Sequence, residues 1–323
     1  MRLLVVADPL ASFKLYKDST YAIMREAQAR GHALWACEPK DLRWRAGRVE
    51  AHACALELLP LTVEQEHTPG IPWWRVLACE SLDLTGFGAV LMRKDPPFDQ
   101  DYLYATYLLE LAERTGARVY NRPRALRDWN EKLAIGRFPQ FTVPTLVSAR
   151  ADDIRAFLAE QGDIVLKPLN AMGGTEVFRL RPGEANIGVT IEVLTHHGRT
   201  PVMAQRFIPE IAQGDKRVLM IDGEPVPYML ARIPAPGETR GNLAAGGRGE
   251  ARALGARERE IALALGPVLK AEGIFLAGLD VIGDWLTEIN VTSPTCFREI
   301  TAQTGCNVAA LFMDALERCI ERG

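Results

Sequence analysis

GLDVIGDWLTEINVTSPT, residues 278–295, is the stretch that decides the fold of this 323-residue chain. Its apolar runs predict two short strands, over 277–282 and 286–291. Gly283-Asp284-Trp285 joins them, and glycine and aspartate both tolerate the positive φ that a tight turn needs. The stretch therefore predicts an antiparallel hairpin.

Three polar side chains of this hairpin are candidate metal ligands. Side chains alternate along a strand, so Glu288 and Asn290 share a face. A three-residue loop centred on Asp284 would set Asp280 opposite Glu288, whereas a two-residue loop would place the two carboxylates on opposite faces. Two carboxylates and an amide oxygen on one face suit Mg²⁺ bound together with substrate phosphates. The alternative is a solvated hairpin face.

The overall composition excludes several classes of function. The net charge is -3 and the basic residues are scattered, so we expect no nucleic-acid partner. The six cysteines (37, 54, 79, 296, 306 and 319) show no CxxC and no paired spacing, which predicts free thiols rather than a zinc or disulfide framework. Neither a signal peptide nor an apolar run of ~20 residues is visible, so we expect a cytoplasmic protein without a membrane partner.

The amino-terminal sequence predicts an open α/β sheet. RLLVVAD (2–8) is typical of a strand buried on both faces. Asp18 or Ser19 can cap the next helix, Gly31 can end it, and ALWACE (33–38) follows as the second strand. GxGxxG is absent after the first strand, which disfavours a nicotinamide or flavin site. GxxxxGK[ST] is also absent, which excludes a P-loop.

A charged triplet follows the next readable strand, 89–92, whereas residues 45–85 yield no functional prediction. Arg93-Lys94-Asp95 comes directly before Pro96-Pro97, which forces an extended exit from the strand. Ligands bind at the carboxyl ends of strands in such sheets. Arg93 is therefore a candidate for contact with an anion, and a surface turn is the alternative.

The middle of the chain contains a candidate phosphate loop. A helix capped by Asp152 or Asp153 and ended by Gly162 precedes a strand that ends in Lys167. The following turn, Met172-Gly173-Gly174-Thr175, can present backbone N–H groups to phosphate oxygens, with Lys167 as a point charge. An ordinary hairpin turn is the alternative.

A hairpin and a glycine-rich segment precede the carboxyl-terminal stretch. Asp222-Gly223 predicts the turn of a hairpin over 214–233. Residues 234–252 contain many glycines and few apolar anchors, which indicates a spacer or a mobile lid. Arg240 and Arg248 within this segment favour a lid.

The polar motifs together resemble the ATP-grasp superfamily. The residues that carry this resemblance are Lys132, Lys167, Met172, Gly173, Gly174, Asp280, Glu288 and Asn290. The longer runs MRKDPPFD, NEKL, KPLNAMGGT, GDKRVL, GETRGNLAAGGRGE and GLDVIGDWLTEINVTSPT are similar to bacterial glutathione synthetases, and they span essentially the whole chain. One departure is Asn170-Ala171, where that family usually has Asp-Gly. The two following glycines remain, so we expect the turn to keep its phosphate cradle.

The resemblance implies ATP-dependent ligation of γ-glutamylcysteine and glycine to glutathione through an acyl phosphate. By the same resemblance Asp280, Glu288 and Asn290 would hold Mg²⁺ or Mn²⁺, and Arg217, Arg232 and Arg240 would be catalytic. The implied ATP-binding residues are Lys132, Lys167, Met172, Gly173, Gly174, Gln205, Ile208 and Asp215. The implied substrate-binding residues are Arg93, Ser293 and Thr295.

The implied fold is an ATP-grasp α/β fold with three parts. They are an open, Rossmann-like α/β substrate-binding domain (1–125), a small α+β lid (126–204) and an α+β core (205–323) with a mobile loop at 234–249. The family resemblance also suggests a homo-oligomer, specifically a tetramer. Two other functions stay open: another ATP-grasp carboxylate–amine ligase, of the D-alanine–D-alanine or glutamate-adding type, and a non-catalytic nucleotide sensor.

Overall fold

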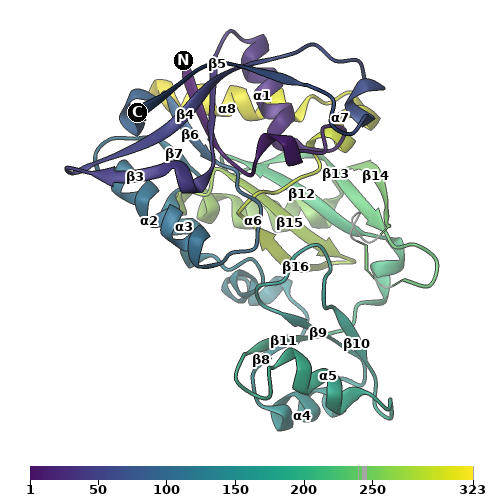
Figure 1. Cartoon of the computed structure of the whole chain (residues 1–323). Coiled ribbons are helices and arrows are strands. Elements are labelled where there is room, and N and C mark those ends of the chain that lie inside the picture. Colours follow the sequence, from purple (N-terminus) through teal and green to yellow (C-terminus); the bar gives the residue numbers. More distant parts are fainter. Residues whose placement is uncertain (239, 242–245, 323) are drawn as a thin grey trace.

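The computed structural model describes residues 1–238, 240–241 and 246–322 as three β-sheets with helices packed against them (Figure 1). The first sheet contains β1 (Arg2–Val6), β2 (Ala33–Cys37), β3 (Leu42–Arg45), β4 (Arg48–Leu58), β5 (Trp74–Asp83), β6 (Ala89–Met92) and β7 (Val119–Tyr120). Its order is β3-β4-β2-β1-β6-β7, with β5 paired to β4. The strands β2, β1, β6 and β7 are parallel, which confirms the predicted open α/β sheet, and β3, β4 and β5 extend it antiparallel.

The first helix begins and ends where its sequence signals predict. In α1 (Ser19–Ala29), Asp18 is the N-cap and its Oδ1 accepts the Tyr21 N–H at 2.8 Å. Gly31 follows with φ +78°. Two further helices of this part are α2 (Gln100–Arg114) and α3 (Pro123–Asp128).

The cysteine prediction is wrong for one pair. Cys54 of β4 lies directly opposite Cys79 of β5, and the two form a disulfide. The hairpin β4–β5 lies within residues 45–85, which gave no prediction, so its strand register could not be used to pair the cysteines. The other four cysteines are free thiols, as expected.

The second sheet is small and covered by two helices. Its strands β8 (Thr145–Ser148), β9 (Ile164–Pro168), β10 (Phe178–Leu180) and β11 (Val202–Arg206) take the order β10-β9-β11-β8. The helices α4 (Ala151–Gln161) and α5 (Ile187–Leu194) bury Ile154, Leu158 and Ile191 against it. The predicted cap of α4 is wrong: Arg150 is the N-cap, and Asp152 and Asp153 lie in the first turn.

The third sheet forms the centre of the molecule (Figure 1). It contains β12 (Asp215–Ile221), β13 (Glu224–Ile233), β14 (Arg248–Ala253), β15 (Leu276–Ile282) and β16 (Trp285–Asn290), all antiparallel, in the order β14-β13-β12-β15-β16. The helices α6 (Ala256–Glu272), α7 (Phe297–Thr304) and α8 (Val308–Arg322) complete this part. Because α8 packs against α1, one buried cluster joins Val5 of β1, Leu219 of β12 and Phe312 of α8.

The hairpin β15–β16 has the predicted pairing but a different turn. Asp280 lies opposite Glu288, yet Ile282 pairs with Trp285, so only Gly283 and Asp284 form the loop. A two-residue loop alone would not pair Asp280 with Glu288. A β-bulge between the Asp280 and Val281 pairs shifts the register by one residue and brings Asp280 opposite Glu288. The predicted three-residue loop is therefore wrong, while the shared face it was meant to explain is confirmed.

The glycine-rich segment is shorter than predicted. Residues 248–252 belong to β14, which pairs with β13 and is therefore not part of a loop. Of the predicted lid, 239 and 242–245 lie outside the described residues. The Asp222-Gly223 turn of the preceding hairpin is confirmed, with both residues at positive φ.

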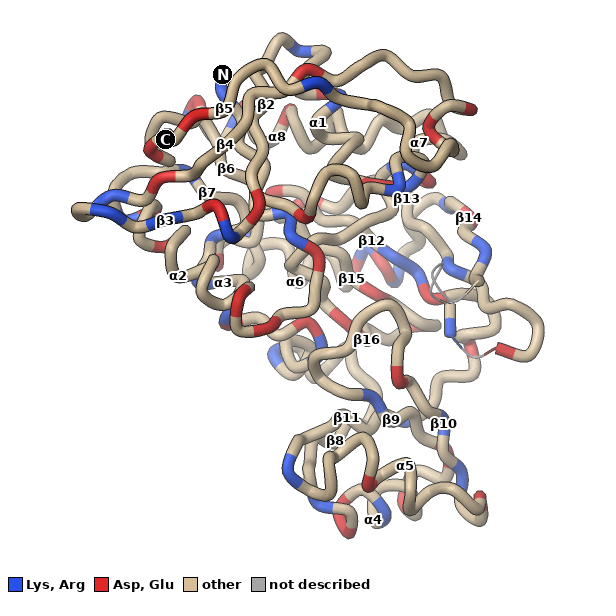
Figure 2. The backbone as a smooth tube through the Cα atoms, viewed as in Figure 1, with Lys and Arg blue, Asp and Glu red and all other residues tan. Residues whose placement is uncertain are grey.

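Charged residues and apolar helices are distributed as follows. Acidic and basic positions are interspersed along the chain in all three sheets (Figure 2). Within the described ranges, no helix is long and apolar enough to cross a membrane.

Candidate active site

A cavity of about 530 Å³ lies between the second and third sheets and reaches the carboxyl end of the first. Its size falls in the range of small-molecule sites. The cavity is lined by sixteen of the seventeen predicted site residues, which come from β9, β11, β12, β13, β15, β16 and the loops beside them.

Arg93 is the exception, since it does not line the cavity. Its guanidinium is buried and donates to Thr20 Oγ1 and to the Pro294 carbonyl, both at 3.1 Å. Arg93 therefore ties β6 to α1 and to the segment after β16. The structure does not support its predicted contact with an anion.

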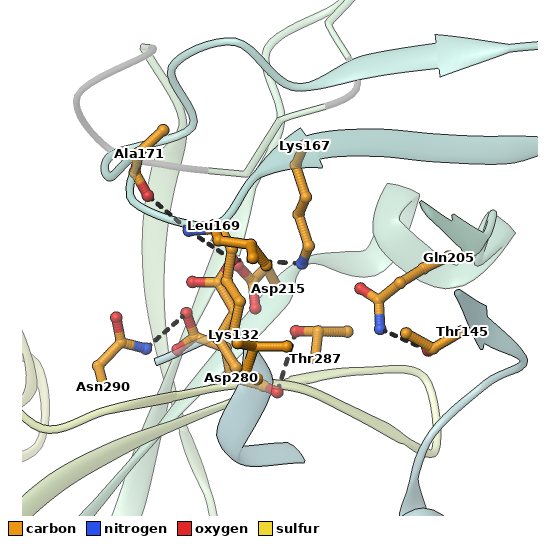
Figure 3. A network of polar contacts seen from close by, with 12 residues as sticks. Lys132, Thr145, Lys167, Leu169, Ala171, Gln205, Asp215, Asp280, Thr287 and Asn290 are labelled. Carbon is orange, nitrogen blue, oxygen red and sulfur yellow. Dashed lines mark hydrogen bonds and ion pairs between the residues drawn. The ribbon is translucent and has the colours of Figure 1, made fainter. Parts of the chain in front are cut away.

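The three predicted metal ligands share one face of β15 and β16. Asp280 and Glu288 are cross-strand partners, and Asn290 Nδ2 donates to Asp280 Oδ2 at 3.2 Å (Figure 3). The bulge also turns Thr287 so that its hydroxyl donates to the Asp280 carbonyl at 3.1 Å. The acidic face is therefore held by the hairpin itself.

Two arginines neutralise Asp280. Arg217 of β12 lies opposite Asp280 in the sheet, and its Nη2 is 3.0 Å from Asp280 Oδ2. Arg232 of β13 reaches the same oxygen at 2.8 Å. Burial opposes the charge of Asp280, but the two arginines outweigh it and hold the pKa of Asp280 well below its ordinary value. Burial raises the pKa of Asp215, which pairs with Arg232, to about 7.

Two lysines face Glu288 across the cavity. Lys167 Nζ, at the end of β9, lies 3.3 Å from Glu288 Oε1, and Lys132 Nζ lies 3.7 Å from the same oxygen. Burial opposes ionisation of Glu288, but these lysines outweigh it and lower its pKa. Burial also lowers the pKa of Lys167. The lysines thus form a compact positive site that faces the carboxylates.

The predicted phosphate turn lies directly over this positive site. Gly173 and Gly174 adopt φ values of +65° and +80°, which residues with a side chain rarely adopt. Lys132 Nζ donates to the carbonyl of Ala171, which anchors the start of the turn (Figure 3). From the other side, Arg240 Nη1 donates to the Gly174 carbonyl at 3.2 Å.

An apolar slot adjoins the lysines. Ile208, Val165 and Phe207 line it. Gln205 of β11 also lines it, and its Nε2 donates to Thr145 Oγ1 at 3.1 Å (Figure 3). Apolar side chains beside cationic groups suit the base of a nucleotide whose phosphates point to the lysines.

Sequence reasoning missed Glu131, which lines the cavity and fixes the backbone directly after β16. Its carboxylate accepts the backbone N–H groups of Val291 and Thr292, at 2.9 and 3.1 Å, and the Thr292 hydroxyl at 2.8 Å. Burial raises the pKa of Glu131. The available signal is the run NEKL, in which Glu131 directly precedes Lys132.

Family models match nearly the whole chain. Residues 1–127 match the prokaryotic glutathione synthetase N-terminal domain, and residues 131–305 match the ATP-grasp domain of the same family. The chain belongs to the prokaryotic glutathione synthetase family. Among curated relatives of this family, the glutathione synthetase of Nitrosomonas europaea is 58% identical over 322 residues, covering 100% of this chain and 99% of the relative. That of Ralstonia nicotianae is 56% identical, covering 98% and 96%.

Solved structures confirm the ATP-grasp fold of this glutathione synthetase family member. The D-cycloserine synthetase DcsG superposes with a TM-score of 0.67 at 15% identity, covering 98% of this chain and 99% of that chain. At this identity the likeness bears on the fold alone.

Proposed function

We propose that the chain catalyses ATP + γ-glutamylcysteine + glycine → glutathione + ADP + phosphate. The observation that carries the proposal is the 58% identity, over the full length, to a relative named for this activity. The cavity supports it, because two lysines, two arginines and two carboxylates converge where phosphates and a reacting carboxylate would meet.

The oxygen donors present fit a divalent cation. Both lysines contact Oε1 of Glu288, which leaves Oε2 as a ligand, and Asn290 donates through Nδ2, which leaves its amide oxygen. Asp280 Oδ1 is contacted by Arg217 and retains a second lone pair. Among the described residues, no three His, Cys, Asp or Glu side chains lie where they could hold a metal ion by themselves, so substrate phosphates would supply further ligands. Bound Mg²⁺ or Mn²⁺ would neutralise phosphate charge.

The chain's own residues position the reactants and stabilise charge. A carboxylate is a poor electrophile, so ATP first phosphorylates the cysteinyl carboxylate, and the amine of glycine then displaces phosphate from the acyl phosphate. Lys132 and Lys167 would hold the transferring phosphate, and Arg217 and Arg232 the developing acyl phosphate. Arg217 and Arg232 line the cavity while remaining fixed by Asp280, so they are preorganised for this role.

The remaining site residues would bind substrates and exclude water. Ser293 and Thr295 line the cavity beside the arginines and would contact the dipeptide. Gln205 and Ile208 would hold the adenine, with the Gly173-Gly174 turn over the phosphates. Arg240 lines the cavity and would help to shield the acyl phosphate from water, which would otherwise hydrolyse it.

The three parts of the fold would have separate roles. Residues 1–125 would bind substrate, 126–204 would form the lid and 205–323 the core with the metal face. We also propose that the protein is cytoplasmic and, from the family resemblance, that it is a homotetramer. Light scattering coupled to size-exclusion chromatography would test the tetramer, and a monomer would contradict it.

The test is ADP release by purified protein with Mg-ATP, adding γ-glutamylcysteine and glycine singly and then together. Turnover only with both, and a product with the mass of glutathione, is the expected result. Turnover only with other acid and amine pairs would indicate a different ligase. Nucleotide binding without turnover on any pair would indicate a sensor.

A further inference from the structure

A buried carboxylate outside the cavity joins three segments of the chain. Glu66 lies in the connection between β4 and β5, residues 59–73, and is only 3% exposed. Its Oε1 accepts the Tyr21 hydroxyl at 3.2 Å and the Arg25 Nη1–H at 2.5 Å, both from α1. Its Oε2 accepts a guanidinium N–H of Arg298, in the first turn of α7. Glu66 therefore ties the 59–73 connection to both helices.

Aromatic contacts anchor the 59–73 connection independently of this carboxylate. Trp73, at its end, stacks on Phe13 with the ring centroids 5.6 Å apart. The same indole packs edge-on against Tyr21 of α1 at 5.1 Å. Figure 1 shows the connection running past α7 before it enters β5. Glu66 is therefore presented to α7 from a packed segment, which makes it a fixed point for that helix.

The backbone between the cavity and α7 needs such a fixed point. Cys296, the N-cap of α7, has φ +90°, a conformation that residues with a side chain rarely adopt. A conformation of this kind persists only when the surrounding contacts enforce it. Two contacts reach the first turn of α7 from other segments: the Phe297 N–H donates to Ser19 Oγ at 3.2 Å, and Arg298 pairs with Glu66. Loss of either contact should let the backbone at Cys296 relax.

We infer that Glu66 is a positioning residue for the ligation, which acts through Arg298 to hold Ser293 and Thr295 where they contact the dipeptide. This inference rests on the proposed function, since Ser293 and Thr295 directly precede Cys296 and are the proposed dipeptide contacts. Neither Glu66 nor Arg298 lines the cavity, so neither touches substrate. Figure 1 shows the third sheet between α7 and the second sheet, against which the nucleotide is proposed to lie. Loss of the pair should therefore impair use of the dipeptide and spare ATP.

The first test is Glu66→Gln, which removes the charge and keeps the shape of the side chain. A displacement of ~1 Å at a substrate contact costs up to ~100-fold, so kcat/KM for γ-glutamylcysteine should fall roughly 10- to 100-fold, mainly through KM. KM for ATP should stay within about twofold of wild type. Glu64→Gln makes the same change at an exposed position of the same segment and should alter neither constant. A protein that is merely less stable loses active molecules and so lowers kcat with both KM values unchanged, which separates positioning from stability.

A second variant keeps the test decisive if Glu66→Gln does not fold. Arg298→Lys keeps a positive charge but loses the planar guanidinium that matches a carboxylate, so KM for γ-glutamylcysteine should rise by a smaller factor. Arg25→Gln removes the half-exposed partner on α1 and should leave this KM within about twofold. Because Glu66 and Arg298 act as one pair, Glu66→Gln and Arg298→Lys together should cost less than the product of their separate factors.

Hydrogen exchange gives a readout that does not depend on the reaction. The amides of Phe297 and Ile300, which bond to Ser19 and to the Cys296 carbonyl, should exchange faster in Glu66→Gln than in the wild type. The amides of β9 and β11 should keep their wild-type rates. Unchanged exchange at α7, an unchanged KM for γ-glutamylcysteine in a folded variant, or an equal rise in KM for ATP overturns the inference. Failure of the wild type to use γ-glutamylcysteine at all overturns the proposed function instead.

Discussion

The substitution Asp280→Asn tests whether Asp280 stabilises or destabilises the acidic face that it forms with Glu288 and Asn290. If Asp280 and Glu288 mainly repel each other when no metal ion is bound, removing one of the two carboxylates should stabilise the protein. The structure indicates the opposite, because Asp280 is contacted by two buried arginines while Glu288 is matched by lysines. We therefore expect Asp280→Asn to destabilise the protein.

The size of the effect follows from the charges left behind. Removing one partner of a buried ion pair costs about 3–5 kcal/mol. Asp215 partly compensates, because loss of the neighbouring negative charge favours its ionised form beside Arg232. The lower part of that range, about 3 kcal/mol, is therefore expected. At about 2 °C per kcal/mol for a chain of this size, Tm should fall by roughly 6 °C.

Thermal unfolding followed by circular dichroism at pH 7.5, without ATP or metal, measures this change. Asp284→Asn, at the exposed turn of the same hairpin, is the control and should leave Tm unchanged. Asp280 has a lowered pKa, so its contribution is present above the ordinary carboxyl pKa of 3.8 and is lost as pH falls through the folded value. The contribution of Asp280 itself should therefore be constant above pH ~5 and shrink below pH ~4, whereas the compensation by Asp215 should be lost as pH falls below about 7. A Tm at or above that of wild type would refute the reasoning.

Three further predictions follow from single contacts. Glu288→Gln should lower kcat at least ~100-fold with an unchanged circular dichroism spectrum, because the charge around the transferring phosphate is no longer balanced. Wild-type turnover in this variant would contradict a role for Glu288 in the reaction. Arg240→Ala should leave ATP affinity within about twofold but raise the ratio of ADP to glutathione formed, and an unchanged ratio would argue against a lid. Cys54→Ser should cost about 3.5 kcal/mol, estimated from loop closure for a sequence separation of 25, and the wild type should lose a similar amount in dithiothreitol; a Tm insensitive to reductant would contradict a disulfide with Cys79.

Local sequence patterns were sufficient to predict caps, turns and strands that are specified by residues of the same stretch of chain. The cap at Asp18, the turn at Asp222-Gly223 and the strand 89–92 were all predictable, because turn and cap residues act on neighbouring backbone. The shared face of Glu288 and Asn290 was also predictable, because both residues lie on one strand. The shared face of Asp280 depended on the register, and the bulge that produces it has no sequence signal of its own.

Features set by contacts between distant segments could not be predicted. The Cys54–Cys79 bond requires the register between β4 and β5, and residues 45–85 gave no prediction of that register. Arg93 follows a strand of the first sheet, where ligands often bind. Its actual partners, Thr20 and Pro294, belong to two distant segments, so the sequence does not reveal these contacts. The same holds for Glu131, whose partners lie about 160 residues further along the chain.

Arg217, Asp280 and Glu288 form one transverse row across β12, β15 and β16, each directly opposite the next. Inserting or deleting one residue before Arg217, Asp280 or Glu288 within its strand would turn that side chain to the other face of the sheet. The side chain would then no longer contact its neighbours in the row. Descendants of this sequence are therefore free to change length at the outer turns. Within these three strands they can vary only by substitution, so gaps in related sequences should stop at the borders of β12, β15 and β16.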